Sequence, residues 1–151
     1  MGNLGCGCPG SMARVIEREE TTPTSGVKAA SELRQWPVQL HLVPPTAPYF
    51  QEADILVCAD CVAFAMGSTH QDLLKGRALA IACPKLDDTS NYVDKLAQIF
   101  SANNVKSVTV AIMEVPCCRG LDIMVREALQ KSGKEIPFES IIIGINGERR
   151  N

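Results

Sequence analysis

DILVCADC, residues 54–61, is the stretch of sequence on which the fold prediction depends. Within it, Ile55 to Cys58 form a short and uninterrupted apolar run. Runs of this kind are typical of strands in a parallel sheet, because helices cover such a sheet on both faces. Similar apolar runs recur at 78–83, 108–113 and 141–145. The sequence therefore predicts several buried parallel strands.

Helical patterns alternate with these runs. Apolar residues recur at helical spacing over 92–100 and 121–129, and a weaker helical pattern covers 66–75. Asp88, Thr89 and Ser90 are candidate caps for the first of these helices. Alternating apolar residues at 38–42 predict one more strand. We expect a single three-layer α/β domain with a mostly parallel, about five-stranded sheet of the flavodoxin/Rossmann-like kind.

The chain divides into two parts by composition. Residues 1–30 combine a Gly/Cys/Pro opening, a charge run and a Thr/Ser/Pro stretch, so we expect a flexible, cysteine-containing N-terminal segment. Residues 31–151 hold the strand and helix patterns and are expected to form the α/β domain. The last four residues, 148–151, are polar and are expected to be disordered.

Composition and charge exclude several classes of protein. The chain has 151 residues, 46% of them hydrophobic and 21% charged, which excludes disorder over the whole length. The net charge of -2 lacks the basic excess of a protein that binds nucleic acid or an anionic membrane. No run reaches the ~18 apolar residues that a membrane span needs. We expect a cytoplasmic protein.

Seven cysteines are the most informative residues of the chain. An odd number cannot be fully paired, and in a reducing compartment clustered cysteines more often bind metal or perform redox chemistry. The cysteines are Cys6, Cys8, Cys58, Cys61, Cys83, Cys117 and Cys118.

Five of these cysteines lie at the ends of predicted strands. Cys58 ends one strand and Cys61 follows it in the turn, Cys83 ends the next strand, and Cys117 and Cys118 follow the third, directly before a helix. The carboxyl ends of parallel strands meet at one edge of the sheet, where α/β proteins bind ligands. We therefore expect these thiols to gather there, although Cys58 is equally compatible with a place in the strand core.

Thiolates at one edge point to a soft ligand. They select zinc, copper(I) or iron–sulfur clusters, and a [4Fe–4S] cluster can draw its ligands from several loops. We expect a [4Fe–4S] protein that exchanges electrons with a redox partner protein. Assembly into a homo-oligomer is compatible with this expectation. The alternatives are a redox enzyme subunit with an unusual or substrate-binding cluster, and a structural zinc or oxygen-sensing module. The crevice at the strand ends also has a place for a flavin, although no motif in the sequence indicates one.

Four segments resemble a known family. They are GCPGS at 7–11, LRQWPVQL at 33–40, ACPKLDD at 82–88 and MEVPCCRGL at 113–121. These segments resemble a ferredoxin-like, 4Fe–4S iron–sulfur binding family of anaerobic prokaryotes. Cys83 with CCRG at 117–120 is also similar to the first half of the CCG motif of heterodisulfide-reductase-type subunits, whose later CxxC is missing here.

The resemblance implies a ligand set. It implies that Cys61, Cys83, Cys117 and Cys118 bind the cluster, with Cys8, Cys58 and Cys6 as alternates. Two adjacent ligands on one cubane are sterically demanding, so one of Cys117 and Cys118 could lie beside the cluster instead.

Overall fold

The computed structural model describes residues 14–19 and 28–151. Its centre is one parallel sheet with the strand order β2-β1-β3-β4. The strands are β1 (Asp54–Ala59), β2 (Arg77–Ala82), β3 (Ser107–Met113) and β4 (Phe138–Ile143). The predicted α/β class with a parallel sheet is confirmed. The expected flexible segment at 1–30 lies largely outside the described residues, as do Cys6 and Cys8.

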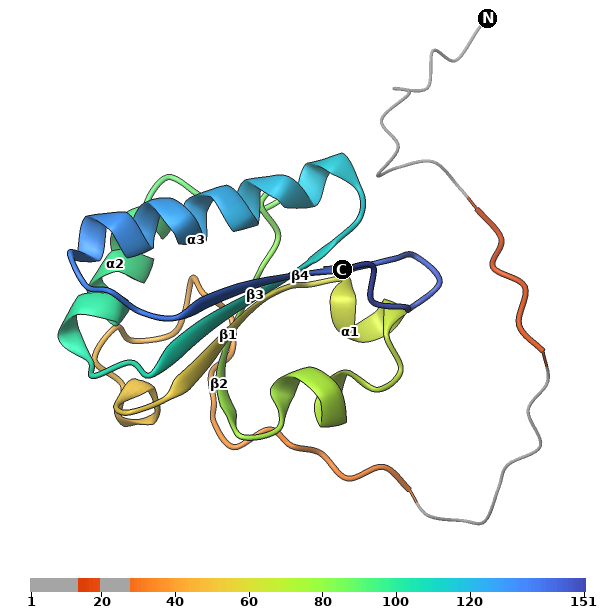
Figure 1. The fold of residues 1–151 in the computed structure, drawn as a ribbon, viewed down its shortest axis with the longest axis horizontal. Coiled ribbons are helices and arrows are strands. Elements are labelled where there is room, and N and C mark those ends of the chain that lie inside the picture. The colour runs from red at the N-terminus through yellow and green to blue at the C-terminus, as the bar shows by residue number, and fades with distance from the viewer. Residues whose placement is uncertain (1–13, 20–27) are drawn as a thin grey trace, which may run out of the picture.

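Helices lie on both sides of this sheet. The two long helices, α2 (Tyr92–Ala102) and α3 (Arg119–Ser132), pack side by side on one face (Figure 1). The short helix α1 (Val62–Ala65) and the π-helical turn η3 (His70–Leu74) lie toward the other face (Figure 1). Two 3-10 turns, η2 (Pro48–Phe50) and η4 (Pro116–Cys118), complete the elements.

The long helices follow the apolar spacing that predicts them. Leu121, Val125 and Ala128 are the buried residues of α3, as expected for positions that fall on one side of a helix. The helix ends at Gly133, whose φ of 70° is the left-handed conformation of a C-cap. At the start of α2 the N-cap is Asn91, without a side-chain cap bond, so the expected caps Asp88, Thr89 and Ser90 were wrong.

The sheet has four strands rather than about five. The expected strand at 38–42 contributes only one bridge, in which Gln39 pairs with Ile81 on the edge strand β2. The chain then turns, because the amides of Leu42 and Val43 both donate to the carbonyl of Gln39. Leu42 is 61% exposed, so its place in the apolar alternation does not reflect a buried face. Of the predicted helix over 66–75, only the π-helical turn η3 (His70–Leu74) forms.

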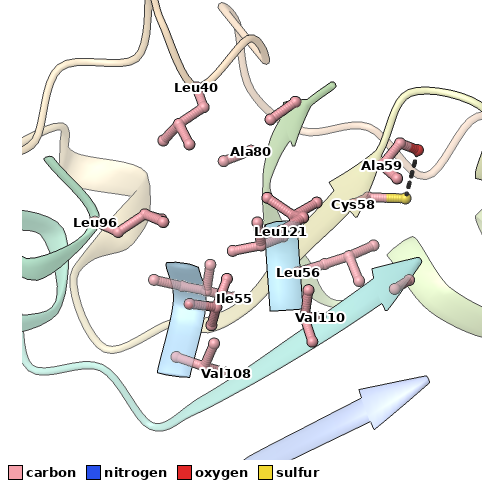
Figure 2. Close-up of a cluster of buried hydrophobic side chains, with 14 of the residues drawn as sticks. Leu40, Ile55, Leu56, Cys58, Ala59, Ala80, Leu96, Val108, Val110 and Leu121 are labelled. Carbon is pink, nitrogen blue, oxygen red and sulfur yellow. Dashed lines mark hydrogen bonds between the residues drawn. The ribbon is translucent and has the colours of Figure 1, made fainter. Parts of the chain in front are cut away.

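The core lies between the sheet and the helices. Leu56 of β1, Val110 of β3 and Leu121 of α3 are among the fully buried residues of this core (Figure 2). All residues of β1 from Ile55 to Ala59 are buried. That burial explains the continuous apolar run, because a central strand has no solvent face.

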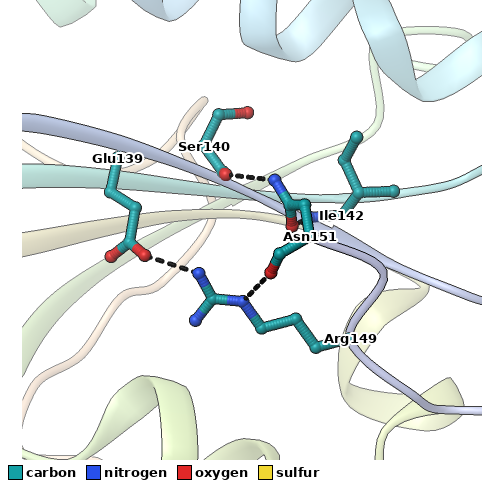
Figure 3. A network of polar contacts seen from close by, with 5 residues as sticks. All are labelled: Glu139, Ser140, Ile142, Arg149 and Asn151. Atoms are coloured by element: carbon teal, nitrogen blue, oxygen red, sulfur yellow. Dashed lines mark hydrogen bonds and ion pairs between the residues drawn. The ribbon is translucent and has the colours of Figure 1, made fainter.

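The C-terminal residues return along the edge of β4. The amide of Arg150 donates to the carbonyl of Ile142 at 2.8 Å, and the side chain of Asn151 bonds both the Ile142 amide and the Ser140 carbonyl (Figure 3). Arg149 pairs with Glu139 at 2.6 Å (Figure 3). The expectation of disorder at 148–151 was wrong, because these polar groups complete the hydrogen bonds of an edge strand.

Candidate cysteine site

The strand order creates a natural crevice between β1 and β3. The chain runs from β1 to β2 on one side and then crosses to β3 on the other side of β1. Such a reversal is a topological switch point, and open α/β sheets bind their ligands there, outside the carboxyl ends of the strands. Cys61 lies two residues beyond the end of β1, and Cys117 and Cys118 lie in η4 beyond the end of β3.

Four thiols line one cavity at this place. The cavity has a volume of about 450 Å³, and Cys61, Cys83, Cys117 and Cys118 all contribute to its wall. The remaining lining residues are mostly apolar, with two basic residues among them: Arg14, Pro84, Lys85, Leu86, Met113, Val115 and Ile145. The structure thus brings together the four cysteines that the sequence singled out.

Two of the cysteines begin helices. Cys61 is the N-cap residue of α1 and Cys118 is the N-cap residue of α3. Among the described residues, no side chain caps the first turn of α3. The amide groups of that turn and the helix dipole therefore favour negative charge beside Cys118.

A close approach places the Cys83 loop against α3. A Cβ atom on Gly120 would lie 3.2 Å from the Cβ of Pro84, which is tighter than an ordinary contact. Only glycine leaves this space unfilled. Gly120 therefore lets the loop of Cys83 approach the start of α3, where Cys118 lies.

The Cys83 loop is held by the side chain of Asp87. The Oδ2 atom of Asp87 accepts hydrogen bonds from the Cys83 amide at 2.9 Å and from the Tyr92 hydroxyl at 2.7 Å. The Asp87 amide donates back to the Cys83 carbonyl at 2.9 Å. In the sequence, the only sign of this contact is that an acidic residue, Asp87, follows the strand-end Cys83 by four positions.

Cys58 belongs to the core rather than to the cavity wall. It is 3% exposed, and its Sγ donates to the Ala59 carbonyl at 3.6 Å (Figure 2). Burial, followed by the nearby Asp60 and Cys118, raises its pKa to about 12. Of the five strand-end cysteines expected at the edge, Cys58 is the one whose side chain packs inward.

The thiols of the cavity influence one another. Burial, together with the neighbouring Cys83, Asp60 and Cys117, raises the pKa of Cys61. Burial raises the pKa of Cys118 to about 11, with smaller contributions from the other three thiols and an opposing backbone hydrogen bond from Met113. These two thiols are therefore protonated at neutral pH, and a positively charged ligand would bind by displacing their protons.

Acidic and basic neighbours have distinct structural roles. Asp60 has one buried carboxyl oxygen without a partner among the described residues, and burial and Asp87 raise its pKa. Glu114 accepts bonds from the Ile145 amide and the Arg150 side chain, and so ties β3 to the C-terminal return. The Nδ1 atom of His70 accepts a hydrogen bond from the Glu32 amide, so this atom is occupied and does not act as a metal ligand.

Two negative observations apply to the described part of the chain. No three His, Cys, Asp or Glu side chains are grouped there as ligands of one metal ion. No helix in residues 14–19 or 28–151 has the length and apolar character for a membrane span.

Comparisons with known proteins identify the domain type. A model of the Rossmann-like domain family matches residues 47–150. A protein of Archaeoglobus fulgidus described as an uncharacterized protein is 34% identical over 116 residues, which cover 77% of this chain and 81% of the relative. No solved structure matches the chain significantly.

These findings correct the family resemblance drawn from the sequence. The matching family is the Rossmann-like domain and the relative is described as uncharacterized, so neither comparison indicates a ferredoxin-like or iron–sulfur family. The sequence resemblance to a ferredoxin-like family was therefore wrong, together with the descriptions it implied: iron–sulfur, 4Fe–4S, metal-binding and electron transport. Among the described residues, no group of side chains is arranged to bind one metal ion. The chain belongs to the Rossmann-like domain family.

Proposed function

We propose that the cavity lined by Cys61, Cys83, Cys117 and Cys118, hereafter the cysteine pocket, binds a [4Fe–4S] cluster and exchanges single electrons with a redox partner protein. One observation carries the proposal: thiols from three separate strand ends line one cavity at the switch point of the sheet. The proposal rests on this site alone and draws nothing from kinship.

The donor set and the space fit such a group. Four cysteine thiolates are the usual ligands of a [4Fe–4S] cluster, and four cysteines are present in the pocket. A cavity of about 450 Å³ has room for a group larger than one ion. The cluster, when bound, supplies one-electron reduction and oxidation.

The surrounding residues favour and shield a charged cluster. A [4Fe–4S] cluster with four thiolates carries net negative charge, which the N-terminal end of α3 and the basic residues Arg14 and Lys85 at the pocket favour. Met113, Val115 and Ile145 give the pocket apolar walls that limit the access of water. Burial and charge of this kind set the reduction potential.

Anaerobic purification or reconstitution tests the proposal. We expect about four irons and four sulfides per chain, a brown protein, and an electron paramagnetic resonance signal after reduction with dithionite. Stoichiometric zinc without acid-labile sulfide would instead establish a zinc site and overturn the proposal.

Single substitutions test the ligand set. Cys83→Ser and Cys61→Ser should each lose most of the iron, whereas Cys58→Ala should keep it, because Cys58 packs into the core. Cys117→Ser and Cys118→Ser, compared with each other, identify whether both adjacent thiols bind. Full iron content in both Cys61→Ser and Cys83→Ser would contradict the proposed site.

A further inference from the structure

Asp87 links the pocket to the start of α2. Its Oδ2 atom accepts the Cys83 amide hydrogen at 2.9 Å and the Tyr92 hydroxyl hydrogen at 2.7 Å. Its own amide donates to the Cys83 carbonyl, so both backbone polar groups of Cys83 are bonded to one residue. Tyr92 is 1% exposed and is the first residue of α2. The loop of Cys83 is thus tied to a buried side chain of the core.

We propose that Asp87, braced by Tyr92, is a positioning residue that fixes the Cys83 loop and lowers the reduction potential of a cluster in the cysteine pocket. This inference rests on the proposed function and adds the residue that tunes the site.

Two effects of Asp87 act in the same direction. Its carboxylate places negative charge beside the Cys83 backbone, and negative charge near a cluster disfavours the additional electron of the reduced state. Its Oδ2 atom also accepts the hydrogen bond of the Cys83 amide, so this amide does not donate a hydrogen bond to a cluster sulfur. Hydrogen bonds to cluster sulfurs raise the reduction potential. Because the Cys83 amide does not form such a bond, the reduction potential stays lower.

The neighbouring acid provides a matched control. Asp88 is exposed, and its Oδ1 atom accepts a bond from the Ser90 amide at 3.1 Å, two residues further along. Asp88→Asn removes the same charge one residue away and leaves the contacts of Cys83 in place. Asp87→Asn keeps an oxygen that can accept both bonds and removes only the charge, whereas Asp87→Ala removes both.

Redox titration of the reconstituted variants measures the electrostatic effect. We expect a positive shift of the midpoint potential in Asp87→Asn and a clearly smaller shift in Asp88→Asn, both at unchanged iron content. In Asp87→Ala we expect a reduced iron content, because the Cys83 loop is no longer held, and a larger positive shift in the molecules that do carry the cluster. Equal shifts in Asp87→Asn and Asp88→Asn, or no shift in either, would overturn the inference.

Amide hydrogen exchange of the cluster-free protein measures the brace. We expect the Cys83 amide to exchange roughly tenfold faster in Asp87→Ala, the factor that corresponds to one lost hydrogen bond, and moderately faster in Tyr92→Phe. Unchanged exchange in Asp87→Ala would overturn the positioning role. If the wild-type protein takes up no cluster, the proposed function and the potential effect fail together, and exchange alone decides the positioning role.

Discussion

Cys58 and Cys118 are both buried thiols close to each other, yet only Cys118 lines the cysteine pocket. Cys58 lies inside β1 and packs among core residues, whereas Cys118 follows β3 and lines the cysteine pocket. The two side chains are 3% and 7% exposed, respectively. Burial alone therefore does not distinguish a core cysteine from a site cysteine, and the direction of the side chain decides.

Gly120 provides a test of the pocket at the residue scale. In Gly120→Ala the new methyl group meets Pro84, so the Cys83 loop must move while the helix itself gains up to ~1 kcal/mol of propensity. We expect a nearly unchanged free energy of unfolding, measured by urea denaturation, and a reduced iron content after reconstitution.

Gly133→Ala is the opposite case. Gly133 has a φ of 70° and no neighbour within 4 Å of an added Cβ. An alanine there is strained by ~1 kcal/mol, so the free energy of unfolding should fall while the iron content stays at the wild-type value. Wild-type iron content in Gly120→Ala would contradict the role of the close approach.

At the scale of the elements, the edge of β4 is closed by side chains as well as backbone. Asn151 uses its amide group to bond Ser140 and Ile142, as a further strand residue would. The exposed pair Arg149–Glu139 lies beside it. The edge strand therefore depends on a polar side chain for part of its hydrogen bonding.

Asn151→Ala tests this edge. We expect faster amide exchange at Ile142 and a loss of about 1 kcal/mol in the free energy of unfolding, because two hydrogen bonds are lost at an exposed position. Glu139→Gln is the control and should cost less than ~0.5 kcal/mol, since exposed ion pairs contribute little. Equal Ile142 exchange in both variants would contradict the closing role of Asn151.

The elements that the sequence predicted well are those with many buried residues. The apolar runs of β1 and β3 and the spacing of α3 follow from burial, which acts on every residue of the element. The segment 38–42 was predicted as a strand because Val38, Leu40 and Leu42 alternate with polar residues, but only Leu40 is buried. A pattern of three residues does not distinguish a strand from a turn beside an edge strand.

At the scale of the whole molecule, buried thiols make the stability sensitive to alkaline pH. Burial raises the pKa of the Cys58 thiol from its ordinary value of 9.0 to about 12 in the folded protein. Above about pH 9 the unfolded chain loses this proton and the folded protein keeps it, so the unfolded state binds fewer protons and stability falls as pH rises. The slope is about 1.4 kcal/mol per pH unit for one proton.

Denaturation with urea at several pH values, in the presence of a reductant, measures this effect. Wild type and Cys58→Ala should differ by a constant amount near pH 7. Between about pH 9 and pH 11 the wild type should lose ~1.4 kcal/mol more per pH unit than Cys58→Ala. Parallel curves for the two proteins over this range would refute the linkage.

The amino-acid sequence by itself determined the α/β class and the gathering of strand-end cysteines. It could do so because burial imposes the pattern of the strands, and because parallel strands bring their carboxyl ends to one edge. Tertiary structure alone decided that Cys58 packs inward, that Asp87 holds the Cys83 loop, and that the C-terminal residues close the edge of β4. These outcomes depend on contacts between residues distant along the chain or on the direction of single side chains, which local patterns do not encode.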